Sequence, residues 1–583
     1  WQQVTPLKKI DYNNADMEHK SDDKGSNESV SIVGRVIGIL SKLIEAFYEA
    51  FVKQSRHNSI PNRIWRFLTS TVLKGQMSEY FDTETDFGRQ LSGWLPNSKF
   101  QQNSESRSGL DMKSLVSKLK NELGVKTVIC WHALNGYWRG VSPELGAQVG
   151  INVTNVMPQP SRHLLSVEPQ LAWDTVSLFG VGLLTSKPDL TKLYENLHEP
   201  LVQAGIDGVK VDVQSGVPAV GGGIGGGPHI ARLYSDALET SIADRFSANG
   251  AASCINCMCH STENLYRYKV TSVARASDDF YPRRPSSHSV HLVNVAYNSL
   301  FIGEICLPDW DMFHSKHESA GLHAAARAVG GCPVYVSDAP GQHDAALLKR
   351  LVLPDGTVLR ARLPGRPTRD CLFRDVGKDG TTVLKVWNAN RHSGVVGAFH
   401  VQGVSWNFDT HENEVVDDSP GVLTAAIKPN DAETMRGEEG PFAVWSHRTS
   451  TVNVLPSGSS SLEIELSHRE WEIFTIAPVQ FSGSGVAWAP IGLGDMLNTG
   501  GALTEDLGLR SSGGDSAPTV IADFSSRGPG RFVAYCQPEP TKILIDGLAP
   551  AQVSFSHEPE SGLLTFSLPG EKNGPHNVKV VWE

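Results

Sequence analysis

A carboxylate in the middle of the chain stands in a setting that indicates nucleophilic chemistry. It is Asp212, in the sequence Lys210-Val-Asp-Val-Gln214. Because side chains two positions apart on a strand lie on one face, Lys210, Asp212 and Gln214 are predicted to share a face. A neighbouring lysine keeps an aspartate ionised, as a nucleophile must be, although a structural ion pair would give the same pattern.

A second carboxylate could supply the acid and base that such a nucleophile needs. It is Asp278, in the sequence Arg275-Ala-Ser-Asp-Asp279. Adjacent acids on a turn are often a helix cap or a surface loop. Asp278 and Asp212, however, end predicted strands two βα units apart, and the mouth of a barrel brings such positions together. Retaining glycosidases use two carboxyl groups about 5–5.5 Å apart, so we predict Asp212 as nucleophile and Asp278 as general acid/base. Partial burial and the neighbouring carboxylates would help Asp278 hold its proton.

Aromatic residues beside polar ones follow the same predicted strands. A sugar presents apolar C–H faces that stack on indole rings, while its hydroxyl groups need polar partners. Trp131-His132 and Asp309-Trp310-Asp311 supply both, and Trp138 lies on another predicted loop. For any single tryptophan, packing in a core is the alternative interpretation.

The order of the predicted elements explains how these side chains could meet. Between Gly109 and Asp338, continuous apolar segments alternate with segments of helical periodicity. This alternation is typical of a parallel sheet buried on both faces. The predicted strands are Thr127–Trp131, Gly208–Val213, Ala252–Asn256, Val270–Ala274, Glu304–Leu307 and Pro333–Val336, and the predicted helices are Leu110–Leu123, Leu190–Ala204, Ile230–Phe246, Val290–Phe301 and Leu322–Val329. Six such strands fit an α/β fold of the (β/α)8 TIM type better than an open sheet, with the polar residues at its mouth.

The chain divides into three predicted parts. Residues 1–105 contain an amphipathic helix at Ile32–Phe51, for which packing on the barrel is favoured over membrane contact. Residues 106–375 form the catalytic barrel, and residues 376–583 form an antiparallel β-sandwich domain. The strands predicted in this last part include Val383–Trp387, Val395–Val401, Phe442–Trp445, Leu462–Leu466 and Trp471–Ile476.

Composition argues against several classes of partner. The 583 residues include 52 Lys and Arg against 63 Asp and Glu, a formal charge of −11, so nucleic acid is not expected as a partner. No uninterrupted apolar run reaches the roughly 18 residues of a membrane span. Eight cysteines are sparse for this length and favour a reducing compartment, which is expected to be the cytoplasm or else a plastid.

Two further motifs are weak indications of a cofactor or metal. The glycine-rich sequence Gly221–Gly227 lacks the Lys-Ser/Thr that completes a phosphate-binding loop. The sequence Cys254-x-x-Cys257-x-Cys259-His260 lies on a predicted strand, which would split its thiols between two faces, and no second half-site follows. Buried thiols are the favoured interpretation, and the proposed chemistry needs no cofactor or metal.

Several longer strings together resemble one known family. They are Val128–Ala133 with Gly136–Trp138, Ala204–Gln214, Val273–Phe280, Leu307–Phe313, Ala325–Cys332, Leu363–Phe373 and Ala489–Leu493. Over most of residues 105–583 the chain resembles the raffinose synthase, seed imbibition protein and alkaline α-galactosidase group of glycoside hydrolase family 36.

The resemblance implies retaining transfer of an α-galactosyl group. The aspartate of the family's Lys-Val-Asp motif corresponds to Asp212, the nucleophile, and the first aspartate after Arg-Ala-Ser to Asp278, the acid/base. The expected substrates are galactinol, sucrose and raffinose, with no nucleic acid or membrane partner. The residues expected to contact the substrate are Trp131, His132, Lys210, Gln214, Arg275, Asp279, Trp310 and Asp311.

The chain also departs from the family pattern. The family has a β-sandwich domain and two barrel strands before this region, and the second strand ends in an Asp-Asp-Gly-Trp-Gln motif that binds galactose hydroxyls. The sequence begins with Trp1-Gln2, so the barrel is expected to lack its first strands. Residues 3–90 match the family poorly. Three functions therefore stay open: a galactinol–sucrose galactosyltransferase, an alkaline α-galactosidase, or an inactive sugar-binding remnant.

Overall fold

The chain forms two compact units. The computed structural model describes residues 3–4, 88–94, 110–158, 160–167, 171, 176–177, 180–247, 252–407, 412–512, 519–547, 553–570 and 574–583. Unit 1 contains residues 1–274 with 408–411, and unit 2 contains residues 275–407 with 412–583. The predicted helix Ile32–Phe51 lies outside the described residues. Within them, no helix combines the length and apolar character of a transmembrane segment.

Unit 1 is built on short parallel strands. Strands β3 (Ile129–Ala133), β6 (Gly208–Asp212) and β7 (Cys254–Asn256) pair in parallel in that order. The first two residues of β8 (Val273–Arg275) extend this sheet by pairing in parallel with β7. Val209 and Val211 of β6 are fully buried. The remaining described elements of the unit are β1 (Gln3–Val4), β2 (Leu91–Gly93), α4 (Met112–Asn121), α5 (Pro143–Val149), β4 (Thr154–Val156), α6 (Arg162–Val167), β5 (Val181–Leu183), α8 (Lys187–Gln203), α9 (Gly216–Ala219), α10 (Gly227–Arg245) and α11 (Thr262–Leu265).

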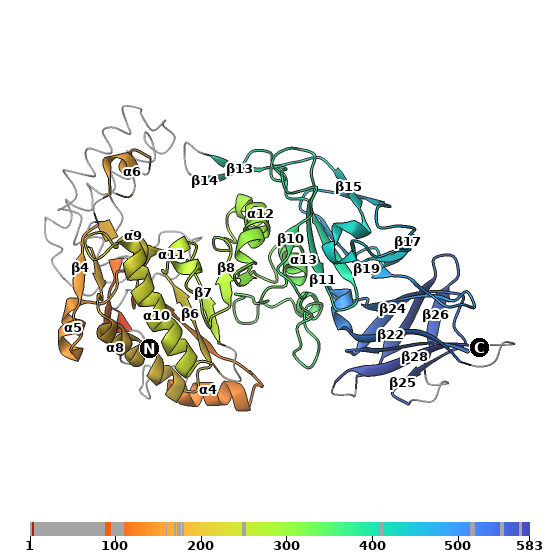
Figure 1. The fold of residues 1–583 in the computed structure, drawn as a ribbon, viewed down its shortest axis with the longest axis horizontal. Coiled ribbons are helices and arrows are strands. Elements are labelled where there is room, and N and C mark those ends of the chain that lie inside the picture. The colour runs from red at the N-terminus through yellow and green to blue at the C-terminus, as the bar shows by residue number, and fades with distance from the viewer. Residues whose placement is uncertain are drawn as a thin grey trace, which may run out of the picture. The chain divides into compact units, whose positions relative to one another are not determined.

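Helices α8 and α10 cover one face of this sheet. They pack against each other, and Figure 1 shows α10 beside β6 and β7. Leu193 and Leu197 of α8 and Ile242 of α10 join Val209 and Val211 in a single core, because apolar residues recur at helical spacing along both helices. The other face of β3 and β6 carries partly exposed side chains, and the candidate nucleophile lies among them.

Unit 2 begins with the end of β8 and continues through two long helices. The elements are α12 (Pro285–Ile302), β9 (Leu307–Asp309), α13 (Ala320–Gly330) and α14 (Ala345–Leu348). The backbone N–H of Ala276, just after β8, donates to the carbonyl of Asp309 in β9. The predicted strand at Pro333–Val336 is wrong, because only Val336 makes a bridge, with Phe313. Pro333 has no N–H to donate to a ladder, which is one reason that pairing stops there.

The rest of unit 2 is antiparallel, as the alternating sequence predicts. The strands are β10 (Arg366–Pro367), β11 (Leu384–Ala389), β12 (Gly394–Phe399), β13 (Val404–Asn407), β14 (Glu412–Val415), β15 (Leu423–Ile427), β16 (Phe442–Ser446), β17 (Thr451–Leu455), β18 (Leu462–Leu466), β19 (Trp471–Pro478), β20 (Gln480–Phe481), β21 (Ala487–Leu493), β22 (Leu503–Ser512), β23 (Thr519–Ser526), β24 (Gly530–Gln537), β25 (Lys542–Ile545), β26 (Phe555–Glu558), β27 (Leu563–Leu568) and β28 (His576–Trp582), with single 3₁₀ turns η7 (Pro429–Asp431), η8 (Glu433–Met435) and η9 (Thr499–Ala502). Sheets β10-β11-β12-β19-β16-β17, β20-β21-β24-β27-β26 and β22-β23-β28-β25 form its main layers. The described residues therefore show an α/β arrangement followed by a β-rich region.

The end of α13 yields a stability prediction. Gly331 caps the helix with a φ of +69°, and a Cβ on it would lie 2.0 Å from the carbonyl oxygen of Leu363. Gly331→Ala is therefore expected to lower the free energy of unfolding by more than ~2 kcal/mol, since the clash adds to the ~1–2 kcal/mol strain of the left-handed backbone. Gly341, with φ +77° and no atom within 4 Å of the point that a Cβ would occupy, is the matched control. Equal urea unfolding midpoints for the two alanine variants would contradict the packing described here.

Candidate active site

The candidate nucleophile lies where β6 ends, in unit 1. Trp131 of β3 is paired with Lys210 of β6, and Ala133 is paired with Asp212. Trp131, Lys210 and Asp212 therefore lie on the same face of the sheet, opposite the helices, as their alternation predicts. The indole of Trp131 remains 37% exposed, so its ring is open to a ligand.

Asp212 is held by two N–H donors. The indole Nε1 of Trp131 donates to its Oδ2 at 3.0 Å, and the backbone N–H of Val213 donates to its Oδ1 at 2.7 Å. The Trp131 ring also contacts Tyr137 edge-on, at 6.0 Å between centroids, and Trp138 at 6.3 Å. An oriented carboxylate beside an exposed indole, with a lysine on the same strand, is an arrangement that suits attack on a sugar.

Gln214 does not share the face of Asp212. Val213 has a φ of 60°, so the strand ends at Asp212 and the alternation of side chains stops there. Gln214 is buried and donates to the carbonyl of Val211 at 3.0 Å and to Asn256 Oδ1 at 2.8 Å. Its position makes it a support for the end of β6.

His132 lies away from the exposed face, as a neighbour of Trp131 on a strand must. Its ring is only 2% exposed, and its Nε2 lies 2.9 Å from Nε2 of His198 on α8. Burial lowers the pKa of His132 to about 4. A neutral, buried imidazole on the helix side of the sheet supports packing, and the structure gives it no access to the ligand side.

In unit 2, an arginine links the residues that follow β8 and β9. Arg275 is buried, and its guanidinium forms ion pairs with Asp311, at 2.8 Å, and with the exposed Asp279. Asp311 Oδ2 also accepts the backbone N–H of Phe280 at 2.8 Å. These contacts fix the loop that carries Asp278 and Asp279 to the end of β9.

A partly buried tyrosine that was not predicted from the sequence completes this cluster. The Tyr335 hydroxyl lies 2.7 Å from Asp309 Oδ2 and 3.4 Å from Asp311 Oδ1. Burial raises the pKa of the Asp309 carboxyl, while the tyrosine hydroxyl and Arg275 oppose that change. The two buried aspartates, the buried arginine and the partly buried tyrosine therefore form one network behind the loop.

Trp310 and Arg327 lie in the interior of unit 2. Trp310 is 0% exposed, and a Cβ added to Gly330 would lie 2.9 Å from its ring, so it packs in a core and is closed to a sugar. Arg327 of α13 is also fully buried and donates to the carbonyls of Trp310, Asp311 and Met312 at 2.6, 3.3 and 3.2 Å. The signal for Arg327 in the sequence is a lone charge within the apolar stretch Leu322–Val329.

Asp278, the candidate acid/base, is exposed on its loop. Its Oδ1 accepts the backbone N–H of Asp279 at 2.8 Å and the Tyr281 hydroxyl at 3.2 Å. Burial and the two carboxylates raise the pKa of Tyr281 to about 12, so this hydroxyl stays protonated and donates. A small cavity of about 50 Å³ lies beside Asp278, and its lining includes Tyr281 and His291.

The described residues contain no cluster of three or more His, Cys, Asp or Glu side chains arranged to hold a metal. Cys254, Cys257 and Cys259 are buried as free thiols, and burial raises the pKa of Cys254. The glycine-rich segment forms the turn before α10, which begins at Gly227.

Comparison with known proteins places the chain among its relatives. The family model described as raffinose synthase or seed imbibition protein Sip1 matches residues 69–568. Two Arabidopsis thaliana proteins, named probable galactinol–sucrose galactosyltransferase 6 and 1, are 41% and 40% identical over 502 and 498 residues. Each alignment covers 84% of this chain and 64% of the relative, so the chain spans less than two thirds of their length. A solved GH31 dextranase of Flavobacterium johnsoniae is 11% identical with a TM-score of 0.43, covering 84% of this chain and 66% of that one. Because the family model matches well over half of its residues, this chain belongs to the raffinose synthase and seed imbibition protein family.

Proposed function

We propose that this chain transfers an α-galactosyl group from galactinol to sucrose in the metabolism of raffinose-family sugars. The observation that carries the proposal is Asp212 at the end of β6, oriented by the exposed indole of Trp131 and beside Lys210. Family membership and the printed names of the two Arabidopsis relatives support the substrate class.

The proposed mechanism is a double displacement. The Asp212 carboxylate attacks C1 of the galactosyl unit while Asp278 gives its proton to the departing oxygen of galactinol. The resulting galactosyl–Asp212 ester has inverted configuration at C1. Asp278, now a carboxylate, then takes the proton of the acceptor hydroxyl as that oxygen attacks C1 and releases Asp212. Two inversions leave the product α-linked.

Some of the other predicted residues are proposed to contact the galactosyl unit, and others are proposed to hold the Asp278 loop or the strand ends in place. We propose that Trp131 and Lys210 contact the galactosyl unit, because both lie on the open face of the sheet with Asp212. Arg275, Asp279 and Asp311 are proposed to fix the Asp278 loop through their ion pairs, with Arg275 and Asp279 also reaching the sugar. The buried side chains of His132, Gln214 and Trp310 are assigned to support of the strand ends.

The strands that carry these residues fit a barrel. We propose that β3, β6, β7, β8 and β9 belong to a (β/α)8 barrel of the TIM type that lacks its first strands. The parallel order β3-β6-β7 with connecting helices supports this, since crossover helices are how parallel strands of a barrel are joined. The same proposal divides the chain into an N-terminal segment at residues 1–105, the barrel at residues 106–375 and the β-sandwich domain at residues 376–583.

The alternative acceptor is water, which would make the protein an α-galactosidase. The sequence Arg275-Ala-Ser-Asp-Asp-Phe-Tyr-Pro282 resembles the branch of the family that contains both seed imbibition proteins and alkaline galactosidases, so it leaves sucrose and water open as acceptors. Supplying galactinol with and without sucrose separates the functions. Raffinose made only with sucrose supports transfer, free galactose supports hydrolysis, and the absence of both products contradicts an active enzyme.

The acid/base assignment predicts a dependence on the leaving group. Asp278→Ala is expected to slow cleavage of galactinol by ~10²–10⁴-fold, because its alkoxide leaves poorly without a proton. The rate at which the galactosyl–enzyme forms from 4-nitrophenyl α-galactoside should fall much less, since nitrophenolate leaves without protonation. Asp375→Ala, at an exposed carboxylate of unit 2, is the control. Equal losses in the pre-steady-state rates of both substrates would contradict Asp278 as the acid.

A further inference from the structure

The loop that carries Asp278 also places a tyrosine hydroxyl on this carboxyl group. The hydroxyl of Tyr281 donates to Asp278 Oδ1 at 3.2 Å, and the backbone N–H of Asp279 donates to the same oxygen at 2.8 Å. The two donors occupy both acceptor positions of Oδ1. Among the described residues, Asp278 Oδ2 has no hydrogen-bond or ion-pair partner. The two carboxyl oxygens therefore have different surroundings.

Tyr281 is itself held by contacts to its backbone and its ring. The hydroxyl of Ser287 donates to the Tyr281 carbonyl at 2.9 Å. The guanidinium of Arg284 lies 5.1 Å from the centre of the Tyr281 ring, within the range of a cation–π contact. A contact of 3.2 Å is long for an O–H donor, and such contacts at catalytic groups commonly shorten when substrate binds.

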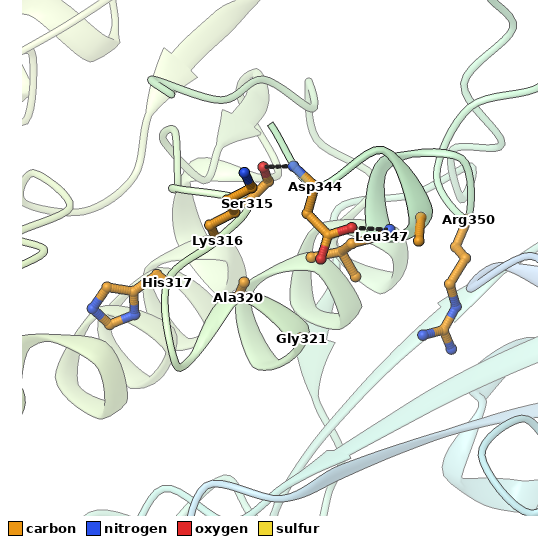
Figure 2. Close-up of a pocket in the computed structure, with 9 residues that line it drawn as sticks. Ser315, Lys316, His317, Ala320, Gly321, Asp344, Leu347 and Arg350 are labelled. Atoms are coloured by element: carbon orange, nitrogen blue, oxygen red, sulfur yellow. Dashed lines mark hydrogen bonds between the residues drawn. The ribbon is translucent and has the colours of Figure 1, made fainter. Parts of the chain in front are cut away.

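The backbone that follows Tyr281 is anchored to a second segment of unit 2. Nδ1 of His317 accepts the backbone N–H of Ser319 at 3.0 Å, so Nε2 of the same ring carries the proton. This Nε2 donates to the carbonyl of Pro282 at 3.0 Å. Figure 2 shows His317 on the chain segment that follows Ser315. Tyr281 is thus fixed on both sides, which suits a residue that orients a catalytic group.

These donors determine which oxygen of Asp278 can carry the acidic proton. The N–H of Asp279 can only donate. The Tyr281 hydroxyl also stays protonated near pH 7, because burial and the carboxylates of Asp278 and Asp279 raise its pKa to about 12. A proton on Oδ1 would have to displace one of these two donors, whereas a proton on Oδ2 displaces neither.

We propose that Tyr281 is a positioning residue for the acid/base, because its hydroxyl holds Asp278 so that Oδ2 exchanges the proton with the sugar oxygens. This role rests on the galactosyl transfer proposed above. In the first step the O–H bond at Oδ2 breaks and its proton goes to the departing oxygen of galactinol. In the second step Oδ2 takes the proton of the acceptor hydroxyl. Tyr281 keeps its own proton throughout and opposes the rotation that would exchange the two oxygens.

Tyr281→Phe tests this role, because it removes the hydroxyl and keeps the ring that Arg284 contacts. The pre-steady-state rate of galactosyl–enzyme formation from galactinol should fall ~3–10-fold, the effect of one hydrogen bond. The rate from 4-nitrophenyl α-galactoside should change less than ~twofold, since nitrophenolate leaves without a proton. In Asp278→Ala, the added Tyr281→Phe should cause no further loss with galactinol. A merely structural defect would instead slow both donors alike.

Tyr297→Phe is the matched control in the same unit. Its hydroxyl donates to the carbonyl of Cys371 and does not line the cavity beside Asp278, so its loss should lower the melting temperature and leave the ratio of the two rates unchanged. Equal losses with both donors in Tyr281→Phe, an unchanged rate with galactinol, or a further loss on the Asp278→Ala background would overturn the positioning role alone. If the unchanged chain formed no galactosyl–enzyme from either donor, the galactosyl transfer itself would be contradicted, and this role with it.

Discussion

Asp212→Asn is expected to lower kcat for galactosyl transfer by ~10⁴-fold or more, equivalent to ~5 kcal/mol of activation free energy. The amide cannot form the ester intermediate, so the double displacement loses its first step. Folding should be unaffected, because the side chain is only half-buried at the end of β6 and asparagine has nearly the same shape. Initial rates of raffinose formation from galactinol and sucrose measure the loss.

The control for this variant is Asp236→Asn on α10, in the same unit. Its carboxylate is exposed and pairs with Lys269, so its loss should change the rate by less than about twofold. A small anion such as azide should partly restore turnover in Asp212→Ala by occupying the vacated space, and the product should then be the β-linked galactosyl azide. If Asp212→Asn retained a tenth or more of the normal rate, the assignment of Asp212 as the nucleophile would be contradicted.

Arg327→Ala is expected to destabilise unit 2 by ~3–5 kcal/mol, because the carbonyls that it satisfies lose their donor, at ~1–3 kcal/mol for each buried acceptor left unpaired, and a cavity remains. The guanidinium is fully buried and donates to the carbonyls of Trp310, Asp311 and Met312. Asp311 has a φ of 60°, a strained conformation for a residue other than glycine, and Arg327 holds its backbone in place. Urea unfolding followed by tryptophan fluorescence measures the loss.

Arg369→Ala is the matched control for Arg327. Arg369 also makes two hydrogen bonds from its guanidinium, to the carboxylate of Glu433, but its side chain is 64% exposed. Because solvent screens such a pair, its removal should change the free energy of unfolding by less than ~1 kcal/mol. If the free energy of unfolding changed by similar amounts in the two variants, the buried hydrogen bonds of Arg327 would not stabilise unit 2 as proposed.

Elements with a strong local pattern can be predicted from the sequence. The prediction for β6 is correct to within one residue, because Val209 and Val211 alternate with polar residues directly after a glycine turn. The prediction for β18, at Leu462–Leu466, has both ends correct because its apolar and acidic residues alternate strictly. The five helices predicted between Leu110 and Val329 are confirmed with shifts of a few residues at their ends, where capping rather than periodicity sets the boundary.

Features that depend on tertiary contacts cannot be predicted in the same way. The left-handed conformation of Val213, a β-branched residue, has no local signal, and it removes Gln214 from the face of Asp212. The sequence around Trp310 allows a sugar-stacking residue as well as a core residue, and its complete burial decides for the core. The opposite placement of His132 and Trp131, by contrast, follows from strand alternation alone and can be expected from the sequence.

Trapping the covalent intermediate tests the central claim most directly. Incubation with a 2-fluorinated α-galactosyl donor slows both displacement steps, and a good leaving group on that donor lets the ester accumulate. Mass spectrometry of the digested protein should then find one fluorogalactosyl group, on the peptide that contains Asp212, and none in Asp212→Asn. A label on another carboxylate, or turnover of the donor without any labelled peptide, would contradict the mechanism.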